Sequence, residues 1–452
     1  MTTAPLSPVV RWIFRFVLRI YRCVSLWFLR SKRYLGIRHA TNNQSLSTSE
    51  QRVLMGKSWD EFCDTLKAAG AVMLAPGAPT DPLTQAEGYR YLSRLARAGL
   101  ENYVECNNVV QPQLCAIANG SRTARICIGS DNPDNLYENA TIDSRYTYVV
   151  KGSRGTVPYL GIGTQSGRYG AEGGLQTVDY VDANNLLYED DDTDSTAKKG
   201  KYFTIILSKD RPASGVKNWL RLSSDISEAM LIVRQTFGIR NLETPASITI
   251  SLSEDETNMK DTTVLTAEHL DNGLQSASIL VAGASAMFAK WAYDFQSQHT
   301  NQLPLFDPIR SLKAGGDPNI RYYHSYWRLE VGEVLQIKFR PPKCRCWNFQ
   351  LNNHWMESLD YRHHSIHTNS SLARPDDGDG EKTSSSYTIL VSHRNPNLYN
   401  KFCGNWIETV GHTCGTMCFR YVAPEVQNDS ELPHPIATVV SHASIVNEWF
   451  DG

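Results

Sequence analysis

The stretch Phe203-Thr204-Ile205-Ile206-Leu207-Ser208 reappears 184 positions later as Tyr387-Thr388-Ile389-Leu390-Val391-Ser392. Three further matches flank it in the same order: Asn132-Pro133 with Asp317-Pro318, Asn218-Trp219-Leu220 with Asn405-Trp406-Ile407, and Arg234 with Arg420. Their offsets are 185, 187 and 186 positions, and four ordered matches at a nearly constant offset indicate an internal duplication. The sequence therefore predicts two similar β-rich units, and any site at their junction combines two related halves.

The duplicated strands place the chain in a mainly β class with helices (α+β). We expect two tandem β-sandwich or jelly-roll-like units and an N-terminal amphipathic helix. Apolar residues at helical spacing between Thr266 and His299 predict one long helix or a helix pair. The expected division is residues 1–39, a basic amphipathic membrane-surface or targeting helix; 40–120, a helical N-terminal region; 121–255, the first β unit; 256–312, a helical connector; and 313–452, the second β unit.

The first copy also carries a family resemblance. Asn218-Trp219-Leu220, a short gap, and an apolar run that ends in Arg234 resemble the end of the family catalogued as domain of unknown function 1214. The stretch Asn132–Tyr137 resembles that family too, so the resemblance covers roughly residues 120–250 and, more loosely, 315–425. Arg221 departs from the family pattern, in which Pro follows Asn-Trp-Leu. The resemblance implies a mainly β fold and no established activity.

A motif kept in both copies more often serves architecture than chemistry. We therefore expect a structural role for its six residues, such as a buried Arg that is hydrogen-bonded to a neighbouring turn. These residues are Asn218, Trp219, Arg234, Asn405, Trp406 and Arg420.

The net charge of −2 conceals an uneven distribution of charge along the 452 residues. Residues 1–49 contain eight Arg or Lys and no Asp or Glu, which leaves 37 basic and 47 acidic residues, a net −10, for the remainder. Nucleic-acid binding requires a basic face, so the acidic body argues against a nucleic-acid partner.

The basic segment predicts an amphipathic helix over residues 8–30 that lies on a membrane surface. Four Arg near the membrane centre cost about 10–14 kcal/mol, roughly twice the gain from the apolar residues, so a surface helix fits better than a spanning one. A cleaved presequence for mitochondria or another organelle, a short snorkelling span or signal anchor, and a helix docked on the protein's own core stay open as alternatives. The expected localisation is therefore membrane-associated, with an organelle as the alternative. The residues assigned to this membrane segment are Arg11, Trp12, Arg15, Arg19 and Arg22.

Neither a metal site nor a cofactor site is predicted. The ten cysteines include no Cys-x-x-Cys pair, and buried thiols are the default for such cysteines. On a strand, His363 and His367 would share a face but lie about 13 Å apart, too far to hold one ion. Glycines at 161, 163 and 167 lack the strand-to-helix setting of a dinucleotide loop, and the chain has no Gly-x-Ser-x-Gly nucleophile elbow.

Two predicted strands of the second unit carry an unusual polar face. Alternation gives residues 322–330 one face rich in Tyr, His and Arg, and gives residues 346–352 one face of Asn and Gln. Such faces present fixed donors and acceptors beside aromatic surface, as small-molecule sites do. The candidate catalytic residues are His324 and Tyr326, as acid or base, and Arg328, which pairs with an anionic group. The candidate ligand-binding residues are Tyr322, Asn348, Gln350, Asn352, Trp355 and Glu357.

The same polar faces have a second interpretation, a buried hydrogen-bond network that fixes the interface between the repeats. The leading functional hypothesis is a membrane-associated protein that binds a small polar or amphiphilic molecule in a cleft on the second unit or between the units. The alternatives are a cofactor-independent acid–base enzyme, a hydrolase or lyase acting on a sugar or lipid derivative, and a structural scaffold.

Overall fold

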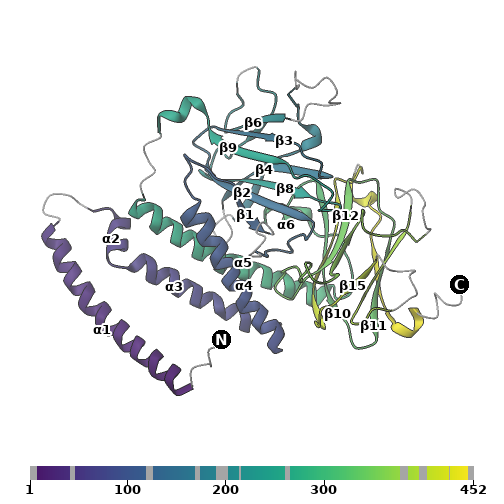
Figure 1. Ribbon diagram of the computed structural model, residues 1–452, viewed down its shortest axis with the longest axis horizontal. Coiled ribbons are helices and arrows are strands. Elements are labelled where there is room, and N and C mark those ends of the chain that lie inside the picture. Colours follow the sequence, from purple (N-terminus) through teal and green to yellow (C-terminus); the bar gives the residue numbers. More distant parts are fainter. Residues whose placement is uncertain are drawn as a thin grey trace.

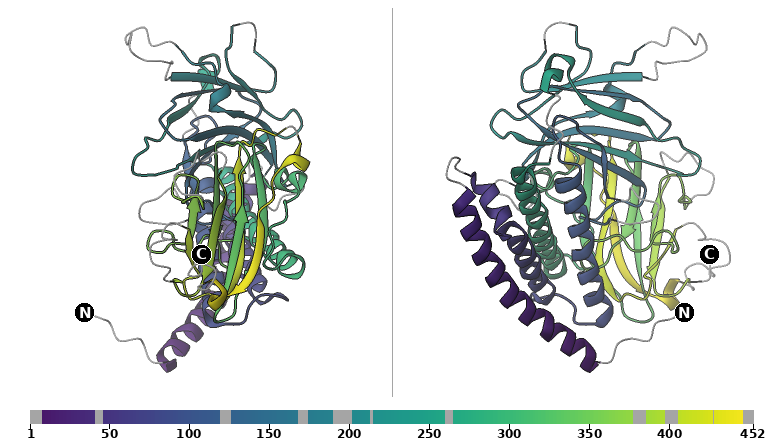
Figure 2. Two further views of the ribbon diagram at one scale, coloured as in Figure 1. Left: turned by 90° about the vertical axis from the view of Figure 1, so that its right-hand side faces the viewer. Right: turned by 60° about the vertical axis from the view of Figure 1, so that its left-hand side comes forward.

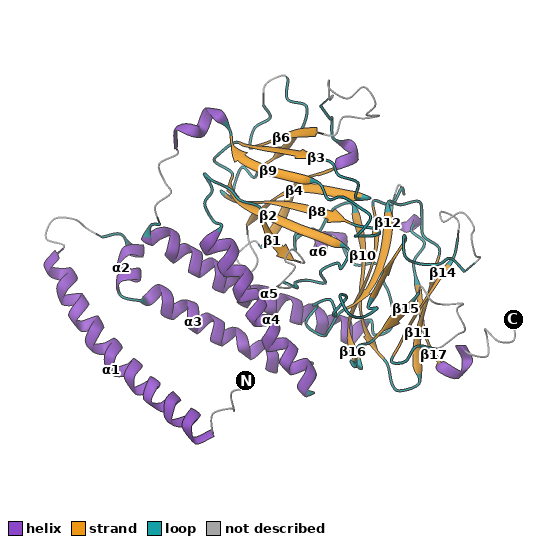
Figure 3. Ribbon diagram, viewed as in Figure 1, coloured by secondary structure: helices purple, strands orange, loops and turns teal. Residues whose placement is uncertain are grey.

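The computed structural model of the protein describes residues 8–40, 46–118, 126–167, 174–189, 202–212, 215–259, 265–376, 385–396, 405–426 and 428–445. About 33% of the chain is helical and 31% forms strands, arranged in four sheets with a helix at the N-terminus (Figures 1 and 3). The combination of sheets and helices is confirmed, but strand does not predominate as expected. The reason is length, because α1 (Pro8–Ala40) and α5 (Ala267–Gln298) have 33 and 32 residues, whereas the longest described strands have 9.

The strands between Cys115 and Leu252 form two sheets. One sheet has the order β1-β2-β8-β4-β5 and the other has the order β7-β6-β3-β9. The strands are β1 (Cys115–Ala118), β2 (Asn135–Asp143), β3 (Tyr148–Ser153), β4 (Tyr159–Gly167), β5 (Leu175–Asp182), β6 (Tyr202–Ser208), β7 (Trp219–Arg221), β8 (Glu228–Thr236) and β9 (Ser247–Leu252).

The strands between Ile320 and Ser441 form two more sheets, with the orders β10-β16-β12-β13 and β15-β14-β11-β17. They are β10 (Ile320–Arg328), β11 (Glu333–Phe339), β12 (Cys346–Leu351), β13 (His367–Asn369), β14 (Tyr387–Ser392), β15 (Trp406–Glu408), β16 (Cys414–Val422) and β17 (Ile436–Ser441). Apart from β1, each strand of the first pair of sheets has a counterpart at the same place in the second pair. Even the parallel pairings correspond, since β6 runs parallel to β7 and β14 runs parallel to β15.

Each pair of sheets shares one buried apolar core. In the first pair, Val150 and Ile205 from one sheet join Ile162 and Leu231 from the other. The second pair has an equivalent core, to which Ile337, Ile389, Phe349 and Phe419 belong. These residues alternate along their strands with side chains of the opposite face, as the period of a β-strand requires.

Helices cover the edge where the two pairs of sheets meet. Thr266 caps α5 by accepting a hydrogen bond from the backbone N–H of His269 at 3.1 Å, and α5 then continues as one helix rather than as a pair. It packs against α3 and α4 and runs past both β regions (Figure 1). The remaining helices are α2 (Thr48–Leu54), α3 (Lys57–Ala69), α4 (Pro82–Leu100), α6 (Pro308–Leu312), a π-helical turn at Glu101–Glu105 and 3₁₀ turns at Gly70–Leu74, Ala183–Asn185, Glu254–Met259 and Asp429–Glu431.

Helix α1 lies on the outer side of α2 and α3 (Figure 2). Arg30 of α1 pairs with Asp60 of α3 and donates a hydrogen bond from Nε to the Met55 carbonyl oxygen at 3.1 Å. Within the described ranges, no helix combines the length and the apolar character that crossing a bilayer requires.

Candidate functional site

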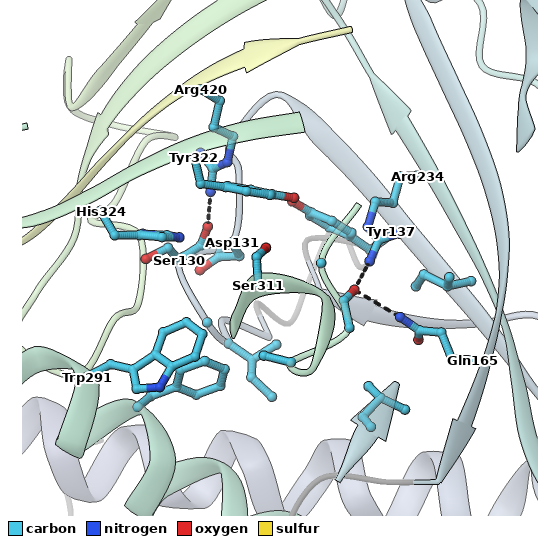
Figure 4. Close-up of a pocket in the computed structure, with 18 of the residues that line it drawn as sticks. Ser130, Asp131, Tyr137, Gln165, Arg234, Trp291, Ser311, Tyr322, His324 and Arg420 are labelled. Atoms are coloured by element: carbon cyan, nitrogen blue, oxygen red, sulfur yellow. Dashed lines mark hydrogen bonds between the residues drawn. The ribbon is translucent and has the colours of Figure 1, made fainter. Parts of the chain in front are cut away.

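The two β regions meet through a reciprocal exchange of hydrogen bonds. Arg420 of β16 donates from Nη2 to the carbonyl oxygen of Ser130, in the segment that precedes β2. Arg234 of β8 donates from Nη2 to the carbonyl oxygen of Gly315, in the segment that precedes β10. Each central strand therefore holds the entry segment of the other region (Figure 4).

Glutamines at matching places in both regions support this exchange. Gln165 of β4 donates to the same Gly315 carbonyl oxygen at 2.9 Å. Gln350 of β12 donates to the carbonyl oxygen of Asp131 at 2.8 Å and accepts a hydrogen bond from Arg420 at 2.6 Å. Because these groups are buried, the entry segments are fixed by bonds that replace their contacts with water.

A cavity of about 120 Å³ lies between the two entry segments. Phe288 and Trp291 of α5 contribute to its wall. Figure 4 shows Trp291 across the cavity from the strands. This volume exceeds by several times what one water molecule needs. The cavity is lined by Ile128, Gly129, Ser130, Asp131, Tyr137, Gln165, Leu175, Met230, Ile232, Arg234, Phe288, Trp291, Ser311, Ala314, Gly315, Gly316, Tyr322, His324 and Arg420.

Two buried polar atoms on the cavity-lining residues have no hydrogen-bond partner in the described part of the protein. They are Nη1 of Arg234 and Nδ1 of His324. Burial, together with the positive charges of Arg420 and Arg310, lowers the pKa of His324 to about 3. The imidazole is therefore neutral near pH 7, and the arginines supply the positive charge of the cavity.

A crystal structure of an uncharacterized protein from Burkholderia cenocepacia is similar to this chain over most of its length. The two sequences are 39% identical, the match covers 87% of this chain and 99% of that one, and the TM-score is 0.75. The chain belongs to the family of this Burkholderia protein. A Vibrio parahaemolyticus protein also matches, with 13% identity, a TM-score of 0.41, and coverage of 78% of this chain and 98% of the other. Neither a protein-family model nor a curated protein sequence matches the chain.

In this member of the family, the three candidate catalytic residues do not all come together, because Arg328 lies near the Tyr326 hydroxyl while His324 lies apart from both. Only His324 lines the cavity. The Tyr326 hydroxyl instead contacts His354 Nδ1 at 3.1 Å and Cys414 Sγ at 3.3 Å, and burial raises its pKa further above the usual value of 10. Arg328 is the last residue of β10 and its side chain is exposed.

The predicted polar face of β12 points toward the entry segment of the first β region. Asn348 donates to Asn132 Oδ1 at 2.9 Å, and Asn352 donates to Ser130 Oγ at 3.1 Å. Asn348 and Asn352, like Gln350, do not appear in the cavity wall, whereas Tyr322 does. The interpretation of this face as a network between the repeats therefore describes its contacts better than the ligand-binding one.

Trp355 and Glu357 lie against helix α4 rather than in the cavity wall. Trp355 donates from Nε1 to the carbonyl oxygen of Thr84 at 2.7 Å. Glu357 is fully buried, pairs with Arg94 and accepts a hydrogen bond from Asn353 at 2.9 Å. These contacts join the second β region to the helical layer.

The Asn-Trp motif makes the same bonds in both copies. The Asn218 side chain donates to the carbonyl oxygens of Leu187 and Thr204, and Trp219 donates to Ser208 Oγ at 3.0 Å. Its counterpart Asn405 donates to the carbonyl oxygens of Arg374 and Thr388, and Trp406 donates to Ser392 Oγ at 3.0 Å. These contacts fit the structural role expected for the motif.

Sequence reasoning missed part of the cavity wall. The repeated motif predicts a structural role for Arg234 and Arg420, but both also line the cavity. Sequence reasoning also missed Tyr137 and Gln165, which the repeat offset of 185 pairs with Tyr322 and Gln350. The signal for these two residues is the repeat itself, because each lies 185 positions before a candidate residue of the second unit.

The last two predictions to be compared with the structure are those on a metal site and on the membrane segment. Among the described residues, no three His, Cys, Asp or Glu side chains lie close enough to hold a metal ion. In the membrane segment, Trp12, Arg15, Arg19 and Arg22 are exposed on α1, while the side chain of Arg11 lies outside the described part.

Proposed function

We propose that the protein binds a small polar or amphiphilic molecule in the cavity between its two β regions. The observation that carries this proposal is the pair of buried polar atoms on the cavity-lining residues Arg234 and His324 that lack a protein partner. A buried donor without a partner costs about 1–3 kcal/mol, and a ligand that accepts a hydrogen bond removes this cost. Trp291 and Phe288 add aromatic surface beside these polar groups, as in many small-molecule sites.

We infer that the two β regions are tandem β-sandwich-like units that arose by duplication. The correspondence of strand orders and the shared core of each pair of sheets support this inference. The matching Asn-Trp contacts are consistent with the resemblance to domain of unknown function 1214, which we retain as a proposal.

We further propose that α1 attaches the protein to a membrane surface. Arginines in the C-terminal half of α1 contact the body of the protein, since Arg22 lies 3.6 Å from Asp60 and Arg33 donates to the Leu54 carbonyl oxygen at 3.1 Å. Large apolar side chains, among them Trp12 and Trp27, remain exposed on the helix. A basic helix that keeps large apolar and aromatic side chains exposed is suited to lie in a lipid interface.

The acid–base hypothesis has less support. With a pKa of about 3, His324 is a weak base near pH 7. Tyr326 and Arg328 do not line the cavity, so they are not placed to act on a molecule that is bound there beside His324. A purely structural role is favoured by the contacts of Asn348, Gln350 and Asn352 and by those of the Asn-Trp motif, but these contacts give no reason for the cavity.

Native and denaturing mass spectrometry of the purified full chain tests the binding proposal. We expect a small molecule to remain bound in the native spectrum and to be released on denaturation. Ser311 lines the cavity, so Ser311→Leu should fill part of it and lower the bound fraction at least several-fold. Ser297→Leu adds the same side chain at an exposed position of α5 and should leave the bound fraction unchanged. A bound fraction that Ser311→Leu does not alter would refute the proposed location.

A further inference from the structure

We propose that the ligand of the junction cavity is a small organic anion, a carboxylate or a phosphate ester, whose charged group is held by Arg234. This inference rests on the proposed binding function and specifies the class of its ligand. Two observations support it. The buried arginines of the cavity form no ion pair among the described residues, and Arg234 and Trp291 lie at different ends of the cavity.

The cavity contains two buried guanidinium groups for which the described residues supply no carboxylate in direct contact. Arg234 is only 8% exposed and Arg420 only 3%. Their hydrogen bonds go to the uncharged carbonyl oxygens of Gly315 and Ser130 and to the amide of Gln350. In the described part of the chain, neither guanidinium forms an ion pair with a carboxylate. Buried charges are normally paired, so this arrangement favours an anion from outside the chain.

The nearby carboxylates are bound elsewhere. Both oxygens of Asp131 accept hydrogen bonds from Ser358, at 3.0 Å from its N–H and 2.6 Å from its hydroxyl. Asp317 accepts from the N–H of Asn319 at 2.9 Å and from the hydroxyl of Tyr159 at 2.9 Å. Burial raises the pKa of Asp317, against the opposing effect of Arg234, and so disfavours its charged form. Asp317 and Asp131 act on Arg234 and Arg420 through their charges, and no direct bond between them is seen among the described contacts.

The free donor of Arg234 fits the charged end of such a ligand. Nη1 of Arg234 has no partner in the described residues, and a hydrogen bond from a guanidinium to an anion is about twice as strong as one between neutral groups. A neutral ligand would satisfy the same donor but would leave the charge unpaired. Arg234 thus favours a carboxylate or phosphate oxygen over an amide or hydroxyl oxygen.

The other end of the cavity fits an organic body. Figure 4 shows Arg234 and Gln165 at one side of the cavity, and His324 and Trp291 at the other. Together with Phe288, the ring of Trp291 offers apolar contact surface. The neutral His324 adds one polar group there without adding charge. A ligand with an anionic head and an uncharged body matches this distribution.

Isothermal titration calorimetry of the full chain with matched probes tests the inference. Benzoate and benzamide have nearly the same shape and differ in charge, while phenyl phosphate presents the same ring with a phosphate head. We expect benzoate or phenyl phosphate to bind at least tenfold more tightly than benzamide, and the tighter of the two identifies the head group. Arg234→Gln should weaken binding of that anion at least tenfold and leave benzamide binding within about twofold.

Two controls separate loss of the site from loss of the fold. Arg211→Gln removes an exposed arginine outside the cavity and should not change anion binding. Arg234→Lys keeps the positive charge and should restore part of the affinity, which a general folding defect would not allow. Equal binding of benzoate, phenyl phosphate and benzamide would overturn the inference but leave the proposed binding function intact. Absence of binding by all three probes, with no molecule in the native mass spectrum, would overturn both.

Discussion

Buried imidazoles set the expected response of this protein to acid. The His354 ring contacts the Tyr326 hydroxyl, and burial lowers its pKa from 6.5 to about 4, although Asp81 acts weakly in the opposite direction. The folded-state pKa is therefore below the unfolded one, and the unfolded chain binds the proton first. The contribution of neutral His354 to stability is complete above pH 6.5 and falls as the pH drops from 6.5 toward 4.

His354→Gln should therefore reduce the loss of stability in acid. Each pKa unit corresponds to about 1.4 kcal/mol, so His354 should account for roughly 3 kcal/mol of the decrease in unfolding free energy between pH 6.5 and 4. Urea unfolding of both proteins at several pH values measures this difference. His412 acts with the opposite sign. Burial lowers its pKa, but the hydrogen bond and charge of Glu87 and the carbonyl oxygens of Thr409 and Val410 together raise it above the usual value, so the wild-type slope alone is not informative. His363→Gln, at an exposed position, is the control; an acid slope that His354→Gln leaves unchanged would contradict the prediction.

At the scale of single elements, α1 carries the membrane proposal. Trp27 is 73% exposed and neighbours the exposed Phe28. Burying a large apolar side chain contributes about 1.5–3 kcal/mol, so Trp27→Gln with Phe28→Gln should lower binding to vesicles at least tenfold. Co-sedimentation with phosphatidylcholine vesicles containing phosphatidylserine measures the effect. Val331→Gln changes an apolar residue that is 88% exposed outside α1 and should bind like wild type. Retention of wild-type binding by the α1 variant would exclude this helix as the attachment site.

The faces of the strands could be predicted from sequence, but their partners could not. Alternation predicts that Tyr323 and Trp327 of β10 lie on the face opposite Tyr322, and in the structure both belong to the apolar core while Tyr322 lines the cavity. The partner of Asn348, however, is Asn132, which lies 216 positions away in the chain. The alternation of side chains along a strand predicts which face of the sheet a side chain lies on, but it does not predict which distant segment that side chain contacts. For this reason the sequence leaves two interpretations of the polar face of β12 open, a ligand site and a network between the repeats.

At the scale of the whole molecule, the duplication predicted which positions correspond, but not where the two copies meet. The repeat offset pairs Arg234 with Arg420, and both occupy central strands of their sheets. The cavity also depends on the relative placement of the β regions and on α5, which supplies Trp291 to its wall. These contacts are tertiary and leave no periodic signal in the sequence. Arg234 and Arg420 were therefore recognised as buried and structural, while their position at a shared cavity was not.

The reciprocal bonds at this junction should make the two β regions unfold together. In urea, tryptophan fluorescence and far-ultraviolet circular dichroism of the wild-type chain should follow one coincident transition. The double variant Arg234→Gln, Arg420→Gln removes the guanidinium donors that hold the Gly315 and Ser130 carbonyl oxygens. The Ser130 carbonyl oxygen loses its arginine donor, which costs about 1–3 kcal/mol, whereas the Gly315 carbonyl oxygen keeps the hydrogen bond from Gln165 and loses only one of two, which costs about 1 kcal/mol. Stability should therefore fall by roughly 2–4 kcal/mol. The lost hydrogen bonds join the two β regions and lie inside neither core. The transitions followed by fluorescence and by circular dichroism should therefore separate in the double variant.

Asn405→Ala provides the matched comparison for this experiment. Asn405 bonds to Arg374 and Thr388 entirely within the second β region, so its loss should lower stability without weakening the junction. The midpoint should therefore move to lower urea while the two signals stay coincident. Separate transitions already in the wild-type chain, or coincident ones in the double arginine variant, would show that the junction does not couple the two regions. If the two transitions coincide in the wild-type chain and separate in the double arginine variant, the arginine contacts at the cavity are what couples the unfolding of the two β regions.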